Sequence, residues 1–299
     1  MNKSHSFRIL FFSFMFMLSI PQSLKAHMYE LGVISLFHNC GPHMKEWVKY
    51  HHKVGVEHFW LYDDASTDNW REELKTYIDK GIVEVISWPC GKPDWTPGQM
   101  NAFRDGLKHA LGTAKWVSCL DQDEFIVPME GASITKCIQK HFNEASAIFI
   151  NWRNFGTSGV TLQPKEPMLP RLTRCSERNH GRNGVGKSIF RPECALIDEM
   201  WSQHHCPLKP GFTYVDGDGT QTLKAVGVDW RPDGKHHDRY IRINHYALGD
   251  EAYFWNVRIK RNGDVPLYHQ LHDQLNATKD FKILDVIKKN FPDFYKEWK

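Results

Sequence analysis

The sequence lacks the residue spacings that mark the common zinc sites. Its seven cysteines are scattered and include no Cys-x-x-Cys pair, which excludes the usual structural zinc spacings. Histidine pairs occur at 51–52, 204–205 and 236–237, but none has His-Glu-x-x-His spacing. An odd number of cysteines leaves at least one unpaired, even if others form disulfides in an exported protein. Cys119 lies in an apolar run and is expected to be a small buried residue.

An excess of charge of either sign is also missing once the N-terminal segment is set aside. Residues 1–26 contain Lys3, Arg8 and Lys25 and no acidic residue, so 35 of the 38 basic residues remain to balance 35 acidic ones. The formal charge of +3 therefore belongs to this segment. Nothing in the charge favours nucleic acid as a partner.

The first 26 residues have the pattern of a signal peptide. Lys3 and Arg8 precede an apolar run over residues 9–20, and Pro21 and a small residue, Ala26, follow it. Twelve residues are too few to span a bilayer comfortably, since a spanning helix needs about 20. We expect cleavage after Ala26 and export through the secretory pathway. An uncleaved segment that anchors the protein to a membrane is the alternative.

The remaining chain alternates between strand and helix patterns. Short apolar runs rich in β-branched residues predict strands, and apolar positions at helical spacing predict the helices between them. Such alternation with short connections is typical of an α/β fold, a mostly parallel sheet with helices on both faces. The strands are expected at 31–37, 56–62, 82–88 and 116–120, and the helices at 43–54, 69–80 and 98–111.

The second half of the chain has a weaker pattern. A helix is expected at 133–145, a strand at 147–152, another strand at 240–246 and a helix at 250–261. Residues 156–220 are rich in Gly, Pro and charge and are expected to form long loops. The tail from Phe281 is expected to form one amphipathic helix.

The first acidic cluster follows the apolar run that ends at Leu120. If the segment is extended, Asp121 and Asp123 point to the same side and can share one cation. Two carboxylates with open positions suit Mg²⁺ or Mn²⁺, which complete their shells with water and phosphate oxygens. A solvated acidic turn is the alternative. Carboxylates between two apolar runs are costly without a cation, which favours the metal site.

The second cluster, Asp63-Asp64, also follows a predicted strand. Ligands of parallel α/β sheets bind outside the carboxyl ends of the strands, and an acid there suits ribose hydroxyls or a base edge. Asp68 is expected to cap the helix that follows.

These residues carry a family resemblance. The chain resembles nucleotide-diphospho-sugar transferases of the GT-A fold, near glycosyltransferase families 2 and 92. The resemblance is dense over about 29–165 and looser over Lys187-Ser-Ile-Phe-Arg-Pro192 and Ile243 to Gly263. The residues that carry it are Phe37 to His51, Gly55 to Asp68, Gln99 to Leu107 with Arg104-Asp105-Gly106, and Asp121-Gln-Asp-Glu-Phe125, which is similar to the Asp-x-Asp metal motif.

The resemblance implies a metal-dependent glycosyltransferase that moves a hexose from a nucleotide-diphosphate sugar to a carbohydrate or glycan acceptor, with inversion. It implies donor contacts at Phe37, Asp63, Asp64, Asp121 and Arg104 or Asp105. It also implies that Asp121 and Asp123 hold Mn²⁺ or Mg²⁺. A histidine of the C-terminal half often supplies a third ligand in such enzymes. His245 is the first choice here, and His204 or His205 the second.

Inverting transfer also needs a general base that takes the proton of the acceptor hydroxyl. Glu124, Asp216, Asp218 and Glu199 are the candidates, and no spacing separates them. A catalytically silent carbohydrate-binding relative is therefore an alternative. A phosphatase built on Asp216 and Asp218 is a third, although the chain after Thr220 is short for the rest of that fold. We expect one GT-A-like domain over 27–299, with donor binding in 27–150 and acceptor binding in 151–299.

Overall fold

A computed structural model describes residues 28–90, 95–163, 166–222, 236–263 and 265–298. The predicted signal peptide or anchor lies outside these residues. Within them, no helix is both long enough and apolar enough to cross a membrane. All seven cysteines are described, and none forms a disulfide. Cys119 is buried, as predicted.

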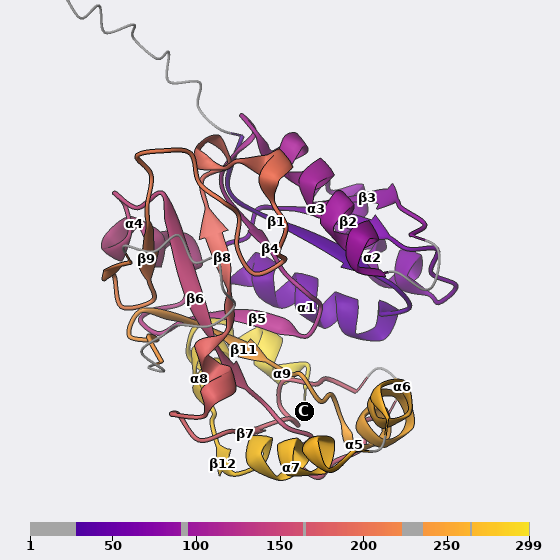
Figure 1. Ribbon diagram of the computed structural model, residues 1–299. Helices are drawn as coiled ribbons and strands as arrows, with labels where there is room; N and C mark the ends of the chain where they lie inside the picture. Colours follow the sequence, from indigo (N-terminus) through magenta and orange to yellow (C-terminus); the bar gives the residue numbers. More distant parts are fainter. Residues whose placement is uncertain (1–27, 91–94, 164–165, 223–235, 264, 299) are drawn as a thin grey trace, which may run out of the picture.

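Four parallel strands form the N-terminal part of the main sheet (Figure 1). They stand in the spatial order β3-β2-β1-β4, and all three pairings between them are parallel. Because the strands are parallel, their carboxyl ends meet at one edge, which brings Phe37, Asp63 and Cys119 to the same side of the molecule. Their bounds are β1 Tyr29–Phe37, β2 His58–Asp63, β3 Val83–Ser87 and β4 Ala114–Cys119.

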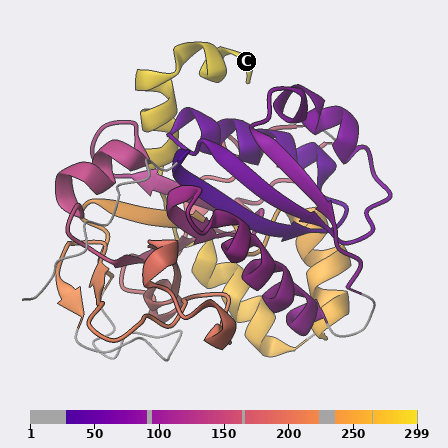
Figure 2. The ribbon, with the colours of Figure 1, turned by 90° about the horizontal axis from the view of Figure 1, so that it is seen from above.

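Helices cover both faces of these strands (Figures 1 and 2). Side chains of β1 alternate between the faces, so Leu31 and Val33 pack with α1 and α2, whereas Ile34 and Leu36 pack with α3. Burial on both faces explains why the strands read as nearly continuous apolar runs. The predicted α/β fold is confirmed. The helices are α1 Gly41–Lys53, α2 Trp70–Asp79 and α3 Trp95–Ala110.

The second half of the chain extends the same sheet. Strand β8 is antiparallel to both β4 and β6, β6 is parallel to β9 and β11, and β5 pairs antiparallel with β11. The sheet is therefore continuous across the predicted boundary at residue 150. These strands are β5 Glu124–Pro128, β6 Ala147–Asn154, β8 Gly186–Phe190, β9 Tyr214–Asp216, β10 Gln221–Thr222 and β11 Ile241–His245.

Short elements surround this sheet. They are α4 Ile134–His141, β7 Arg174–Cys175, β12 Thr278–Lys279, α5 Glu251–Tyr253, a π-helix at Phe254–Arg258, α6 Ile259–Asn262, α7 Pro266–Leu275, α8 Lys282–Asn290, α9 Pro292–Lys296 and 3₁₀ turns at Gly181–Gly184, Pro192–Cys194 and Ile197–Glu199.

Two expectations about these segments were wrong, and one helix was missed. Residues 156–220 contain strands β7 to β9 and three 3₁₀ turns rather than loops alone. Their strands are two to five residues long, too short to show a periodic pattern. The tail holds two helices, because Pro292 begins a second one after α8. Helix α7 was not predicted.

Candidate functional site

The acidic motif forms a turn, not an extended segment as predicted. The amide of Glu124 donates to the carbonyl of Asp121 at 3.1 Å, which closes a four-residue turn between β4 and β5. Asp121 and Asp123 are therefore not aligned by an extended chain, which we had wrongly expected.

Gln122 anchors this turn to the neighbouring strand. Its side-chain amide donates to the Ser35 hydroxyl at 2.6 Å and to the Leu36 carbonyl at 2.7 Å, both on β1. The middle residue of the motif thus faces inward, and Asp121 and Asp123 flank it. Their side chains are 27% and 36% exposed, so both remain accessible to a ligand.

Two donors from distant parts of the chain hold the carboxylate of Asp121. Lys187 Nζ on β8 lies 2.8 Å from Asp121 Oδ2, and Gln99 Nε2 on α3 donates to Oδ1 at 2.8 Å. Lys187 has no exposed surface. Burial alone would lower the pKa of its ammonium group, but Asp121 and then Glu124 raise it above the ordinary value.

Glu124 lies beneath the turn and is also fully buried. Its Oε2 accepts from the Asp121 amide at 2.9 Å and lies 3.3 Å from Lys187 Nζ, while its Oε1 has no hydrogen-bond partner among the described residues. Burial raises the pKa of Glu124 well above its ordinary value, and the Lys187 charge opposes this rise. As a candidate base, Glu124 is thus shielded from any acceptor in this structure.

Asp123 faces the end of strand β11. Its Oδ2 lies 3.6 Å from Nε2 of His245, the last residue of that strand. Burial by itself would raise the pKa of Asp123, but His245, and after it Arg258 and Lys187, lower it to about 2. The histidine chosen first from the sequence therefore does lie beside the acidic turn.

A chain of side-chain amides fixes the orientation of His245. Asn183 Nδ2 donates to the carbonyls of Glu177 and Arg178, which can only accept. Asn183 Oδ1 must then accept from Asn154 Nδ2, at 2.9 Å, and Asn154 Oδ1 accepts from His245 Nδ1, at 3.0 Å.

The orientation of His245 bears on whether the site fits a divalent metal. With the proton of a neutral imidazole on Nδ1, the lone pair of His245 Nε2 faces the carboxylate of Asp123. A proton on Nε2 would pair the ring with Asp123, and a divalent cation between these two acceptors would take the place of that proton. A second-shell partner on Nδ1 is usual for a metal-binding histidine. Asp123 and His245 therefore fit Mn²⁺ or Mg²⁺. Both oxygens of Asp121 already accept from protein donors.

The second-choice histidines contact neighbouring tryptophan rings. The ring of Trp152 on β6 contacts His245 at 4.0 Å and His204 at 5.3 Å between centroids. His204 also bonds the carbonyl of Gly186 through Nδ1. His205 is buried against Trp201.

The predicted donor residues on β1 and β2 lie at the same sheet edge. The side chain of Phe37 is buried against Trp70, so only its backbone can face a ligand. Asp63 Oδ1 accepts from the Ser66 amide, and Asp64 Oδ1 from the Cys90 amide. Asp63 also borders a cavity of about 510 Å³ between α2 and β3, which Trp70, Arg71, Lys75, Ile78, Val85 and Ser87 line with it.

Asp68 lies one residue before the N-cap of α2 and accepts from the first amides of both α1 and α2. Its Oδ2 accepts from the amide of Gly41, the first residue of α1, at 2.7 Å, and its contact to the Trp70 amide is 3.4 Å. The N-cap of α2 is Asn69, whose side chain makes no capping bond.

Arg104 and Asp105 are engaged elsewhere on α3. Arg104 donates to the Met200 carbonyl and to Asn101, and Asp105 accepts from the Tyr62 hydroxyl at 2.7 Å. The residue of α3 that reaches the acidic turn is Gln99, at the start of the segment that carries the family resemblance.

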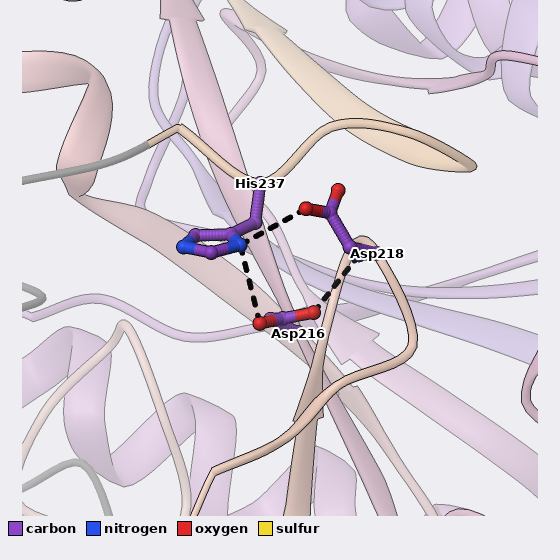
Figure 3. Close-up of side chains that lie close together, drawn as sticks. All are labelled: Asp216, Asp218 and His237. Atoms are coloured by element: carbon purple, nitrogen blue, oxygen red, sulfur yellow. Dashed lines mark hydrogen bonds and ion pairs between the residues drawn. The ribbon is translucent and has the colours of Figure 1, made fainter. Parts of the chain in front are cut away.

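Asp216 and Asp218 form a separate cluster with His237 (Figure 3). His237 Nδ1 lies 3.3 Å from Asp216 Oδ2 and 3.0 Å from Asp218 Oδ2. Among the described residues, this is the only group of three or more His, Cys, Asp or Glu side chains whose ligand atoms lie within 4.8 Å of one another. The histidine pairs at 51–52 and 204–205 form no such group.

Backbone amides hold this cluster in place. The Asp218 and Thr220 amides donate to Asp216 Oδ1, and the Arg239 amide donates to Asp218 Oδ1. Asp216 pairs with Phe149 on β6, whereas His245 pairs with Asn154, five residues farther along. That offset is about 17 Å of strand at about 3.3 Å per residue. The remaining candidate base, Glu199, is exposed at the end of a 3₁₀ turn.

Three residues that hold the site were not predicted to act there: Gln99, Asn154 and Lys187. Gln99 and Lys187 both lie in segments that carry the family resemblance, and this was their only sequence signal. The site therefore takes residues from both predicted halves of the chain.

Comparison with known proteins agrees with the resemblance. The profile of Glycosyltransferase family 92 matches residues 41–230. A family 92 protein of Ricinus communis is 28% identical over 194 residues, which cover 64% of this chain and 34% of that protein. One from Arabidopsis thaliana is 28% identical over 200 residues, covering 62% of this chain and 33% of that protein. The chain thus spans about a third of the length of these curated relatives.

Solved structures give only distant likenesses. Staphylococcus aureus TarS 1–349 matches 55% of this chain and 48% of its own at 16% identity, with a TM-score of 0.36. Glucosyl-3-phosphoglycerate synthase from Mycobacterium tuberculosis, in complex with Mn²⁺ and UDP, matches 56% of this chain and 58% of its own at 12% identity, with a TM-score of 0.32. The family profile, by contrast, covers more than half of the sequence, and the chain belongs to glycosyltransferase family 92.

Proposed function

We propose that this chain transfers a hexose from a nucleotide-diphosphate sugar to a carbohydrate or glycan acceptor, with Mn²⁺ or Mg²⁺ as cofactor and with inversion at the sugar. Membership of family 92 supports the reaction class. The observation that carries the proposal is the pair Asp123 and His245, whose facing atoms lie 3.6 Å apart with the imidazole oriented by Asn154.

In this proposal the two acidic residues of the turn have different roles. Asp123 and His245 hold the metal, which offsets the charge that develops on the departing diphosphate. Asp121 is oriented by Lys187 and Gln99 and accepts hydrogen bonds from hydroxyl groups of the donor.

The nucleoside is placed at the carboxyl ends of β1 and β2. Asp63 and Asp64 lie there, and Asp63 borders the cavity between α2 and β3. This position follows the general rule for ligands of parallel α/β sheets.

Thermal unfolding with a panel of nucleoside diphosphates, with and without Mn²⁺, tests donor binding. We expect one nucleotide to raise the melting temperature only when Mn²⁺ is present, because a ligand that binds the folded state alone stabilises it. Asp123→Ala should abolish this shift. A shift that survives in Asp123→Ala would refute the metal assignment. The anomeric configuration of the product, followed by proton NMR during the first turnovers, tests inversion.

A catalytically silent carbohydrate-binding relative is the second candidate. Its support is the placement of the proposed bases, since Glu124 and Asp216 are fully buried. This candidate is favoured if the protein binds glycans but neither hydrolyses a bound nucleotide sugar nor transfers its sugar.

We also propose that the protein is exported or anchored by residues 1–26. Expression with a C-terminal tag, followed by fractionation and N-terminal sequencing, separates the two. Mature protein that begins at His27 supports cleavage, and an intact N-terminus in the membrane fraction supports the anchor.

A further inference from the structure

We propose that Lys187 is a positioning residue for the donor site: its buried ammonium holds the carboxylate of Asp121 in the orientation that binds the nucleotide sugar. This inference rests on the proposed function and adds to it a residue of the second half of the chain. Lys187 itself does not touch the donor, because its side chain has no exposed surface.

The position of Lys187 follows from the strand order. It lies on β8 opposite Ile150 of β6, and β8 also pairs with β4, the strand that leads into the acidic turn. The long side chain therefore passes beneath the turn, and Nζ ends 2.8 Å from Asp121 Oδ2 and 3.3 Å from Glu124 Oε2.

The two contacts make one connected arrangement. Glu124 Oε2 accepts from the Asp121 amide at 2.9 Å, so Lys187 binds the side chain of Asp121 and also the group that holds its backbone. Gln99 binds the other oxygen of the Asp121 carboxylate. Both the backbone and the side chain of this partly exposed residue are thus held before any ligand binds.

A buried ion pair of this kind is a weak source of stability. Removing an ammonium group and carboxylates from water is costly, and apolar side chains of similar volume often replace such groups without loss. A fully buried lysine beside an accessible carboxylate is better explained by its effect on that carboxylate. Loss of a hydrogen bond to a charged group changes ligand affinity by about 10- to 100-fold.

The test compares nucleotide affinity in the full chain by isothermal titration calorimetry, with UDP and GDP in the presence of Mn²⁺ as probes. Lys187→Met keeps the length and apolar stem of the side chain and removes the charge. We expect its dissociation constant to rise at least about tenfold over the wild-type value. The matched control is Lys115→Met, which removes a surface lysine that pairs with Glu30 on the neighbouring strand and should bind like wild type.

Lys187→Met leaves Glu124 buried without its cation and can fail to fold. The double variant Lys187→Met/Glu124→Gln removes both buried titratable groups. We expect it to fold, as circular dichroism will show, and still to bind the nucleotide at least about tenfold more weakly than the wild type.

The outcomes separate this inference from the proposed function. The positioning role is wrong, and the proposed function stands, if a folded Lys187 variant binds a nucleotide as tightly as the wild type does. This holds for the single and for the double variant. If the wild type binds neither probe with Mn²⁺, nor any nucleotide of the thermal panel, both proposals fall. Weaker binding by the folded variants, with Lys115→Met unchanged, supports the role.

Discussion

Nε2 of His245 lies 3.6 Å from Oδ2 of Asp123, although 122 positions separate the two residues in the chain. The register of β11 against β5 places His245 opposite Glu124, directly after the acidic turn. On its other side, His245 bonds Asn154, whose amide is oriented through Asn183 by two backbone carbonyls. The pair thus brings the end of β11 beside the acidic turn.

His245→Gln is expected to lower the affinity for Mn²⁺ in the presence of the bound nucleotide by at least about tenfold, because it removes one of the two proposed protein ligands. Titration calorimetry of the nucleotide complex measures this. His141→Gln is the matched control, since His141 also faces a carboxylate, Glu130, at 3.1 Å but lies on α4. Equal Mn²⁺ affinity in His245→Gln and wild type would rule His245 out as a ligand.

Replacement of Asn154 should weaken Mn²⁺ binding in a graded way. Asn154→Leu removes the acceptor that keeps the His245 proton on Nδ1, and we expect an affinity loss of about 10- to 100-fold. Asn154→Asp keeps an acceptor for Nδ1 but sets an oxygen against Asn183 Oδ1, so it should lose stability more than affinity. Calorimetry and thermal unfolding together measure both effects. A larger affinity loss in Asn154→Asp than in Asn154→Leu would contradict the role of the acceptor.

His51 makes folding stability depend on pH. Its Nδ1 donates to the Trp47 carbonyl and its Nε2 accepts from the Ile126 amide, so the folded state holds the neutral ring. Burial lowers its pKa to about 3, against about 6.5 in the unfolded chain. Between these values the unfolded chain binds the extra proton, so stability is full above about pH 6.5 and falls as the pH drops toward 3.

At pH 5 the protonation of His51 in the unfolded chain lowers the free energy of unfolding by about 2 kcal/mol, at about 1.4 kcal/mol per pKa unit. Urea unfolding at pH 7 and pH 5 measures the drop in unfolding free energy between the two. This drop should be about 2 kcal/mol smaller in His51→Gln than in wild type. His52→Gln, one position along on the helix surface, is the control and should keep the wild-type dependence. The same dependence in His51→Gln and wild type would show that other groups cause it.

Gly186 lies where β8 passes close to β6. A Cβ at this position would overlap the carbonyl oxygen of Ile150 and lie 2.7 Å from its carbon, and backbone cannot move aside easily. Gly186→Ala should therefore cost about 3 kcal/mol of unfolding free energy or more. Gly184→Ala is the matched control, because nothing lies within 4 Å of its Cβ, and it should change stability by less than about 0.5 kcal/mol. Chemical denaturation of both variants measures the difference, and similar stabilities would contradict the strand packing described here.

Much of the N-terminal half was predictable because each element there is long and regular. Strand β1 has apolar residues on both faces, and α1 begins at Gly41-Pro42 and ends before a glycine with positive φ, Gly55. The predicted strand ends therefore placed both acidic clusters at one edge of the sheet, as the structure does. The second half was less predictable, because its strands are short and pair with partners distant in the sequence.

The sequence by itself determined the fold class and the family, and it singled out Asp121, Asp123 and His245, because strand alternation and motif residues are local in the chain. The tertiary structure alone decided how those residues are held. The turn after Leu120 turns Gln122 inward, and the antiparallel entry of β8 between β4 and β6 sends Lys187 beneath Asp121. Such contacts depend on strand order and register, which bring together residues that no local pattern links.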